Sequence, residues 1–345
     1  QHWASRDSSS MGDLSPAGTL PKALTPQAGD VEVETVVRRS LSAPVLRRQE
    51  HIVRGIVYIV AATLLFVTMN TSVKWLSAYL HPVEMIWARC TGQLVFVLCA
   101  FAPQYGGWRL FATKRPLAQV GRSVVQLAST SMFITAIGKV ALADATSISF
   151  SAPLIVAALS GPALGERVTR VQWLAIATGF GGALIIIRPT GGDTSLWALL
   201  ILGSAFCYAG YQLLTRRVAG VDPPQTSVLY SALAGGIVLS TLVPFYWTTP
   251  RGWLQWTLFV SLGLIGGLGH YCVARAFSYG RAAVISPFHY AQLIWASLVG
   301  YVIFGHVPGI WTWLGAAVIV GSGLFIALVE AATPTRPAVG GRGAG

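Results

Sequence analysis

Several long apolar stretches of this chain carry polar side chains at helical spacing, and these side chains are the ones that could bind a small molecule. Gln126 and Thr130 are four residues apart, so they share one face of a predicted helix. A polar group inside hydrocarbon is costly without a partner, which makes each one a functional candidate by default. The candidate binding residues are Asn70, Gln126, Thr130, Ser149, Ser151, Tyr208, Tyr211, Gln212, Tyr271, His289, Tyr290, Gln292 and Trp295.

For any single member of this set, hydrogen bonding between helices is as good an explanation as contact with a ligand. As a set spread over six predicted helices, the residues indicate a central aqueous cavity. Pro153 removes a backbone hydrogen bond and exposes the carbonyl near Ser149, which predicts a kinked, polar wall. We expect His289, Gln292 and their large neighbours to decide which compound is bound, and the small hydroxyls beside Pro153 to serve every compound.

Lys74, Glu84, Arg89 and Pro153 are interpreted as structural or ion-pairing residues. Lys74 lies near the end of a predicted helix, which favours snorkelling of its ammonium to the membrane interface over ligand contact. Arg89 lies deeper and is not ideally spaced to pair with Glu84, five residues earlier. We expect it to find a carboxylate or carbonyl elsewhere; binding of an anionic group is the alternative.

Several kinds of chemistry have no motif in this chain. There is no Walker loop, no Gly-x-Ser-x-Gly, no His-Glu-x-x-His and no pair of carboxylates within the apolar stretches. The four cysteines lie in apolar stretches without metal-ligand spacing. We therefore expect no enzyme activity, no catalytic residue, no metal and no cofactor.

Composition indicates a membrane protein. Of 345 residues, 54% are hydrophobic and only 10% are charged, against roughly 25% in an ordinary soluble chain. The first fifty positions contain six of the twelve acidic residues and also six basic residues, so the net charge of +12 belongs to the remainder. The basic residues stand singly or in pairs between apolar stretches, which is typical of topology signals and argues against nucleic-acid binding. The predicted partners are the lipid bilayer and a small molecule.

The apolar stretches predict an all-α polytopic protein with ten transmembrane helices. Each has about the 20 residues that a helix needs to cross hydrocarbon. Two Gly-x-x-x-Gly pairs, Gly161/Gly165 and Gly263/Gly267, are predicted packing seams. The expected spans are 53–75, 83–102, 120–141, 145–164, 170–188, 195–215, 225–247, 253–274, 282–304 and 310–330.

The basic residues predict the orientation of these spans. Nineteen Lys and Arg fall on the side of the N-terminus and four on the other, which places both termini in the cytoplasm. Residues 1–50 are rich in Ser, Pro, Gly and charge and are expected to form a disordered cytoplasmic tail. Twenty Arg against four Lys is compatible with a GC-rich genome, so a bacterial inner membrane is the expected location.

The chain contains a weak internal repeat. Gly165-Glu166-Arg167-Val168 with Trp173-Leu174 recurs 140 residues later as Gly305-His306-Val307 with Trp313-Leu314. Each half holds five predicted spans, and an odd number inverts the second copy relative to the first. Inverted repeats with a binding site between them are the architecture of secondary transporters. Duplication within a structural membrane protein is the alternative.

The sequence resembles EamA-type members of the drug/metabolite transporter superfamily. The resemblance covers roughly residues 52–330 and implies a first five-helix repeat at 51–190, a second at 191–331 and a cytoplasmic tail at 332–345. It also implies export or exchange of small metabolites. It rests on Asn70-Thr71-Ser72-Val73-Lys74-Trp75-Leu76, Pro82-Val83-Glu84, Trp87-Ala88-Arg89, Ala152-Pro153-Leu154, Leu164-Gly165-Glu166-Arg167-Val168, Gly179-Phe180-Gly181-Gly182 and Ile187-Arg188-Pro189.

These patterns predict a secondary transporter of a small polar or zwitterionic metabolite, such as an amino acid, its derivative or a nucleoside-like compound, working as a monomer or homodimer. No carboxylate lies at the middle of a span, which argues against proton coupling through such a group. The alternative is a receptor or scaffold with a vestigial cavity, in which the tail is the working part.

Overall fold

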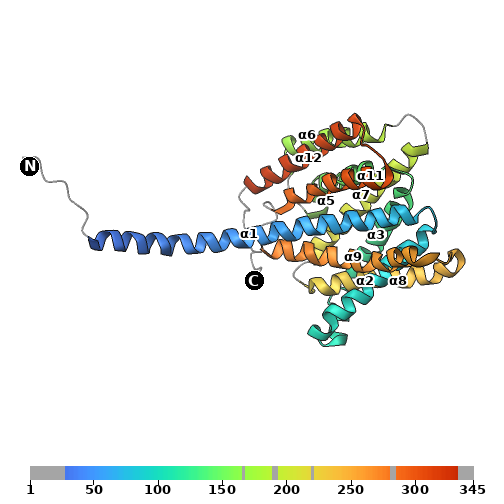
Figure 1. Ribbon diagram of the computed structural model, residues 1–345, viewed down its shortest axis with the longest axis horizontal. Helices are drawn as coiled ribbons and strands as arrows, with labels where there is room; N and C mark the ends of the chain where they lie inside the picture. The colour runs from blue at the N-terminus through green and yellow to red at the C-terminus, as the bar shows by residue number, and fades with distance from the viewer. Residues whose placement is uncertain (1–27, 165–167, 189–192, 219–220, 280–284, 333–345) are drawn as a thin grey trace, which may run out of the picture. The chain divides into compact units, whose positions relative to one another are not determined.

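The computed structural model describes residues 28–164, 168–188, 193–218, 221–279 and 285–332, and these residues form helices and no strand. In Figure 1 the colour of the helices follows the chain, from blue near the N-terminus to red near the C-terminus. The first half contains α1 (Ala28–Leu76), α2 (Pro82–Tyr105), η1 (Gly107–Phe111), α3 (Pro116–Ile137), α4 (Leu142–Ser149), α5 (Ala152–Leu164) and α6 (Arg170–Ile187). The second contains α7 (Asp193–Val218), α8 (Pro224–Tyr246), α9 (Gly252–Tyr279), η2 (Ser286–Tyr290), α11 (Ala291–Phe304) and α12 (Ile310–Ala332).

The chain divides into two units, residues 1–49 and 50–345. The predicted disordered tail covers the first unit, yet residues 28–50 are helical as the beginning of α1. That residues 1–50 form a disordered cytoplasmic tail stays a prediction. Residues 1–27 and the predicted C-terminal tail beyond Ala332 lie outside the described residues.

Prolines and capping side chains fix where several helices begin. Pro82, Pro116 and Pro224 occupy the first positions of α2, α3 and α8, where a missing N–H costs nothing. His81 and Glu84 form a capping box at the start of α2, in which the His81 N–H donates to Glu84 Oε1 at 3.3 Å. Glu84 thus has a capping contact in the structure, in keeping with the structural role predicted for it.

Eight of the ten predicted spans correspond to helices of the described chain that are long and apolar enough to cross a membrane. The other two fall on α3 and on η2 with α11. The first turns of α3 carry Gln119, Arg122 and Ser123, which are buried among protein groups and lower its hydropathy. Helix α11 has only 14 residues because the segment before it, Ser286–Tyr290, is a 3-10 turn.

The fourth predicted span is a broken helix. Helix α4 ends at Ser149 and α5 begins at Ala152, with Phe150 and Ser151 in the break. Pro153 follows directly, and it has no N–H to donate to the Ser149 carbonyl four residues earlier. The kink that the sequence predicts at Pro153 is therefore confirmed.

The helix pairs of residues 50–345 repeat when the two halves are exchanged. Helix α6 packs on α12, α2 on α8 and α4 on α11, and the α2–α9 pair has its counterpart in α8–α3. Figure 1 shows α6 beside α12, and α8 beside α2. The described residues thus form an all-helical bundle of two halves, in keeping with the predicted repeat of five spans.

Small residues let the helices approach closely within the bundle. A Cβ atom added to Gly92 of α2 would lie 2.9 Å from the Gly263 Cα of α9, so neither position has room for a side chain. The predicted packing seam at Gly263 and Gly267 is confirmed by this contact and by Phe96, which fills the space beside Gly267. The predicted partner of Gly161, Gly165, lies outside the described residues.

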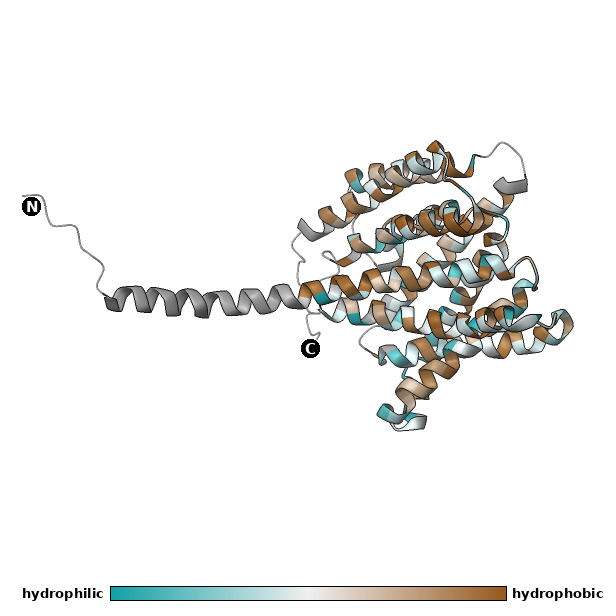
Figure 2. Ribbon diagram, viewed as in Figure 1, coloured by the Kyte–Doolittle hydropathy of each residue, from teal (hydrophilic) through white to brown (hydrophobic). Residues whose placement is uncertain are grey.

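Apolar side chains cover much of the outside of the bundle. Figure 2 shows brown, apolar residues along the long helices of residues 50–332, and Leu174, Leu196 and Val302 are each more than two thirds exposed. Such a surface is stable against lipid but not against water. The sequence-based prediction of an integral, multi-pass membrane protein is confirmed.

Lys74 has a different role from the one predicted. Its ammonium donates hydrogen bonds to the backbone carbonyls of Ile137 at 3.1 Å and Val140 at 2.6 Å, and it lies 5.5 Å from the centre of the Phe304 ring. Lysines stabilise helix C-termini by satisfying such carbonyls. Lys74 is therefore structural, as expected, but it ties α1 to the end of α3 and does not snorkel to the interface.

A polar cluster joins α3, α8 and the connection after η1. The Asp222 carboxylate accepts hydrogen bonds from the Lys114 backbone N–H at 3.0 Å, from the Thr113 hydroxyl and from the Gln119 amide at 3.0 Å. These bonds, the backbone one first, favour the ionised form and hold the pKa of Asp222 below its ordinary value. The carboxylate thus stabilises the fold while it is charged.

We predict that Asp222→Asn lowers the free energy of unfolding by about 1.5–3 kcal/mol, the usual range for a lost hydrogen bond to a charged group. Because the pKa of Asp222 is lowered on folding, its contribution is present above the unfolded pKa near 3.9 and is lost as the pH falls through the lower folded value. Thermal unfolding in detergent, followed at pH 7 and below pH 4, should therefore show a deficit for the variant at pH 7 that shrinks on acidification. An equal deficit at both pH values would contradict this role.

Candidate functional site

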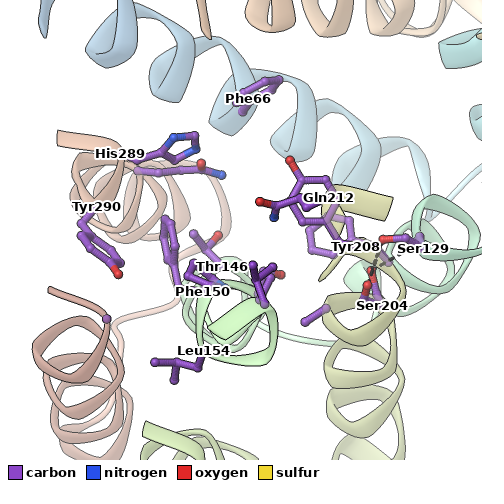
Figure 3. Close-up of a pocket in the computed structure, with 18 of the residues that line it drawn as sticks. Phe66, Ser129, Thr146, Phe150, Leu154, Ser204, Tyr208, Gln212, His289 and Tyr290 are labelled. Carbon is purple, nitrogen blue, oxygen red and sulfur yellow. Dashed lines mark hydrogen bonds between the residues drawn. The ribbon is translucent and has the colours of Figure 1, made fainter. Parts of the chain in front are cut away.

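A cavity of about 830 Å³ lies within residues 50–332 and is lined by both halves of the bundle. Figure 3 shows Phe66 of α1 on one side, Thr146 and Leu154 opposite, and His289 and Tyr290 facing Tyr208 and Gln212 across the space. The size is that of sites for drug-sized molecules, which range from about 300 to 1,000 Å³.

The lining mixes uncharged polar groups with aromatic rings. Uncharged polar side chains come from α1, α3, α4, α5, α7, α9, η2 and α11, and several of the rings come from phenylalanines that the sequence gave no reason to single out. Among the described lining residues there is one arginine, two histidines and no Asp or Glu. The polar and aromatic lining residues are Phe66, Asn70, Arg89, Gln126, Ser129, Thr130, Phe133, Thr146, Ser149, Phe150, Ser160, Ser204, Tyr208, Gln212, His270, His289, Tyr290 and Gln292.

Nine of the thirteen predicted binding residues line this cavity. They come from both halves, which confirms that the polar positions of separate spans converge. The nine are Asn70, Gln126, Thr130, Ser149, Tyr208, Gln212, His289, Tyr290 and Gln292.

Four predicted binding residues lie elsewhere. Ser151 is fully buried in the break between α4 and α5, and Tyr211 lies over the Arg122 guanidinium at 4.9 Å from the ring centre. Tyr271 is on the outside of α9, with its ring 6.3 Å from that of Phe101, and Trp295 packs against the apolar core. Tyr211, Tyr271 and Trp295 are on helices that line the cavity, but on faces turned away from it, and the packing of the neighbouring helices decides which face that is.

Arg89 and Pro153, which the sequence predicts to be structural, both line the cavity. No carboxylate of the described residues pairs with Arg89, so the expected ion pair is not formed; its Nη1 donates instead to Thr130 Oγ1 at 2.9 Å. The reason is that the acidic side chains lie near the ends of the spans, out of reach of a residue placed one third of the way along α2.

Two serines hold the polar wall of the cavity together. The Ser129 hydroxyl of α3 donates to the Ser204 carbonyl of α7 at 2.9 Å, and the Ser204 hydroxyl donates to the Ser129 carbonyl at 2.8 Å, as Figure 3 shows by dashed lines between them. Their hydroxyls are therefore already paired. Gln126 differs, since its amide oxygen is buried without a partner among the described residues.

Sequence reasoning missed the rings of the cavity. Phe66, Phe133 and Phe150 line it, and Phe150 lies between His289, with ring centres 6.1 Å apart, and Tyr290, at 4.9 Å. A phenylalanine in an apolar span carries no signal that it faces a cavity and not lipid. Only Phe150 had an indirect signal, its place in the break before Pro153.

The cavity lies toward one end of the bundle. Ser160, Gln212, Val273 and Ala327 line it close to the C-terminal ends of α5, α7, α9 and α12. Near the opposite end, where α4 and α12 begin, the Thr312 hydroxyl donates to Asp144 Oδ1 at 2.6 Å and joins the two halves. The cavity therefore lies between the two repeats, extends to the end of the bundle where α5, α7, α9 and α12 end, and can hold a small molecule.

Known proteins similar to this chain are bacterial transporters. It is 27% identical to a riboflavin transporter of Rhizobium johnstonii over 82% of this chain and 94% of that protein. It is 27% identical to an S-adenosylmethionine uptake transporter of Rickettsia felis over 76% and 88%, respectively. A riboflavin transporter of Vibrio cholerae is 35% identical, over 52% of this chain and 60% of that protein.

A solved crystal structure shares the fold. It matches with a TM-score of 0.58 and 18% identity, covering 83% of this chain and all of the other. The EamA-like transporter family matches this chain twice, at residues 53–188 and 195–328. With two matches over most of its length, the chain belongs to the EamA-like transporter family, whose members are membrane transporters and not enzymes.

Proposed function

We propose that this protein is a secondary transporter that exports or exchanges a small polar or zwitterionic metabolite, such as an amino acid, its derivative or a nucleoside-like compound, by alternating access. The observation that carries the proposal is the cavity of about 830 Å³, lined by both halves with polar and aromatic side chains. A site between inverted repeats can be exposed to either side when one half rocks against the other. The relatives named above carry riboflavin and S-adenosylmethionine, and a pseudopaline exporter of Pseudomonas aeruginosa is 28% identical.

The side chains of η2 and α11 are placed to set selectivity. His289, Tyr290 and Gln292 line the cavity from η2 and the start of α11, whereas Ser149 and Pro153 line it from beside the break between α4 and α5. Rings and amides can stack on or hydrogen-bond an extended part of a metabolite. A carbonyl and small hydroxyls at a break allow close approach of any substrate to the backbone.

We also propose that both termini are cytoplasmic and that the membrane is a bacterial inner membrane. Exposed basic residues, including Arg54, Arg109 and Arg170, lie at the end of the bundle where α2 ends and α6 begins. Exposed tryptophans, including Trp253 and Trp311, lie at the start of α9 and α12, at the other end. Positive charge favours the cytoplasmic side, and Trp is enriched at membrane interfaces.

Gln292→Ala should change the relative preference among transported metabolites. Losing one hydrogen bond to substrate costs about 1 kcal/mol, which is several-fold in a binding constant. Full-length protein in liposomes, supplied with a broad panel of amino acids, their derivatives and nucleosides, gives the flux of each compound.

Two variants of α11 provide matched controls for this experiment. Leu298→Ala changes an exposed side chain of the same helix, and Trp295→Phe changes one that packs on the core; both should keep the order of preference of the wild type. Wild-type protein that moves no member of the panel would contradict the proposed function. Changes at His289, Tyr290 and Gln292 that leave every compound unaffected would contradict the site.

Cysteine labelling tests the orientation. In a variant whose four native cysteines are alanines, we expect Trp253→Cys to react with a membrane-impermeant maleimide added to intact cells, and Arg109→Cys to react only after the cells are permeabilised. Both positions are exposed, so access to the reagent depends on the side of the membrane. The reverse pattern would mean that the termini are outside.

A further inference from the structure

Arg89 is a partly buried cation whose hydrogen-bonding capacity is mostly unused. Its guanidinium offers five N–H donors, yet within the described residues it makes one hydrogen bond, from Nη1 to Thr130 Oγ1 at 2.9 Å. Its Nε is buried without a partner among the described residues. The residue is seven positions after the start of α2, or about 10 Å along the helix, which places it inside the hydrocarbon region.

The other cations inside the described bundle are satisfied differently. Lys74 donates to two backbone carbonyls, and Arg122 donates to Ser227 O, Ser231 Oγ and Thr215 Oγ1 while it lies over the Tyr211 ring. These groups are locked into the structure by the protein itself. Arg89 has only Thr130, and it faces the cavity.

The surroundings of Arg89 provide no negative charge. The described lining of the cavity contains no Asp or Glu, so a positive group in low dielectric lacks a countercharge from the protein. A buried charge without a partner costs several kcal/mol, and proteins usually keep such a charge where it has a function. The missing partner is what a ligand could supply.

The space beside Arg89 has room for one oxygen of an oxyanion whose remainder lies in the main cavity. A side pocket of about 30 Å³, room for about one water-sized group, is lined by Arg89, Gln126, Thr130 and His270, all of which also line the main cavity. A Cβ atom at Gly266 of α9 would lie 3.7 Å from Arg89 Nε, so the glycine leaves the guanidinium edge open. The Gln126 amide can turn its NH₂ toward the same place.

We propose that Arg89 binds an anionic group of the substrate, a carboxylate or a phosphate, and that this protein therefore carries anionic metabolites. This inference rests on the proposed function and narrows its range of substrates. It excludes cationic metabolites as substrates and predicts weaker binding of a neutral metabolite than of an anionic one. A guanidinium pairs with both kinds of oxyanion through parallel N–H···O bonds. Thr130 and Gln126 complete the group that surrounds the anion.

The rest of the substrate is expected to be planar. Beyond Arg89 the cavity presents Phe66, Phe150, Tyr208 and Tyr290, rings that pack against flat, partly apolar surfaces. Phe66 and Tyr290 lie on different sides of the space in Figure 3, so a planar group can be held between them while its anionic end reaches Arg89. The substrate class is a planar or aromatic metabolite with a carboxylate or phosphate.

Matched probe pairs test this class directly. Indole-3-acetate is compared with indole-3-acetamide, and adenosine 5′-monophosphate with adenosine, with tryptamine as the cation. Binding to full-length protein in detergent is measured by the shift in its unfolding temperature, and flux of the same probes is measured in liposomes. At least one anion should bind about 10-fold to 100-fold more tightly than its neutral partner. The two pairs distinguish a carboxylate from a phosphate.

Variants of Arg89 separate charge from packing. Arg89→Gln should abolish the preference of each anion over its neutral partner while changing the affinity for the neutral partner by less than about two-fold, and Arg89→Lys should keep part of the preference. Arg109→Gln, a change at an exposed arginine of η1, should leave the preference unaltered. If Arg89→Gln does not fold, the affinities of the wild type for the anionic and the neutral member of each probe pair still test whether an anion is preferred.

Binding and flux are read separately, so the two proposals can fail separately. Equal or tighter binding of the neutral or cationic probes by the wild type overturns the role of Arg89, and so does binding of none of the probes. In either case flux of other metabolites would leave the transport proposal in place. Selective binding of an anion without flux of any compound would instead support the role of Arg89 and contradict transport.

Discussion

Inside a bilayer, every backbone N–H and C=O must find its partner within the protein, and the arrangement of this molecule depends on that constraint. It forces long helices, and it allows irregular backbone only beside a cavity. The described spans are interrupted at Phe150–Ser151, between α4 and α5, and at the 3-10 turn η2, Ser286–Tyr290. Both interruptions contribute lining residues, among them Phe150 and Tyr290. The cavity is thus the place where this fold contains non-helical backbone.

The low dielectric inside the bundle makes a cation without a partner costly, and the cations there are of two kinds. Lys74 and Arg122 are saturated by carbonyls and hydroxyls, and they fix helices to one another. Arg89 retains unused donors at the surface of the cavity. Because a cation without a partner is costly in hydrocarbon, the first kind contributes to the fold and the second is available to a ligand. Asp222 shows the complementary case of a carboxylate satisfied by three donors near the end of the bundle.

Much of the candidate site was predictable because helical spacing is regular. Gln126 and Thr130 are four apart and both line the cavity, as do Tyr208 and Gln212. Trp295 is also at helical spacing from Gln292, yet it packs against the core. Spacing gives the relative positions of side chains on one helix but not the rotation of that helix about its axis, which the packing of neighbours sets.

The sequence by itself determined the class of the protein, the number of its spans and their inversion, because hydropathy over 20 residues and a repeat of five spans are properties of the chain alone. The family came from the resemblance of its sequence motifs. The tertiary structure decided the partners of polar groups. It placed Lys74 on the carbonyls of α3, Tyr211 on Arg122, and Arg89 at the cavity without a carboxylate. These outcomes depend on groups more than forty residues apart in the chain, and only the packing of the helices brings such groups into contact.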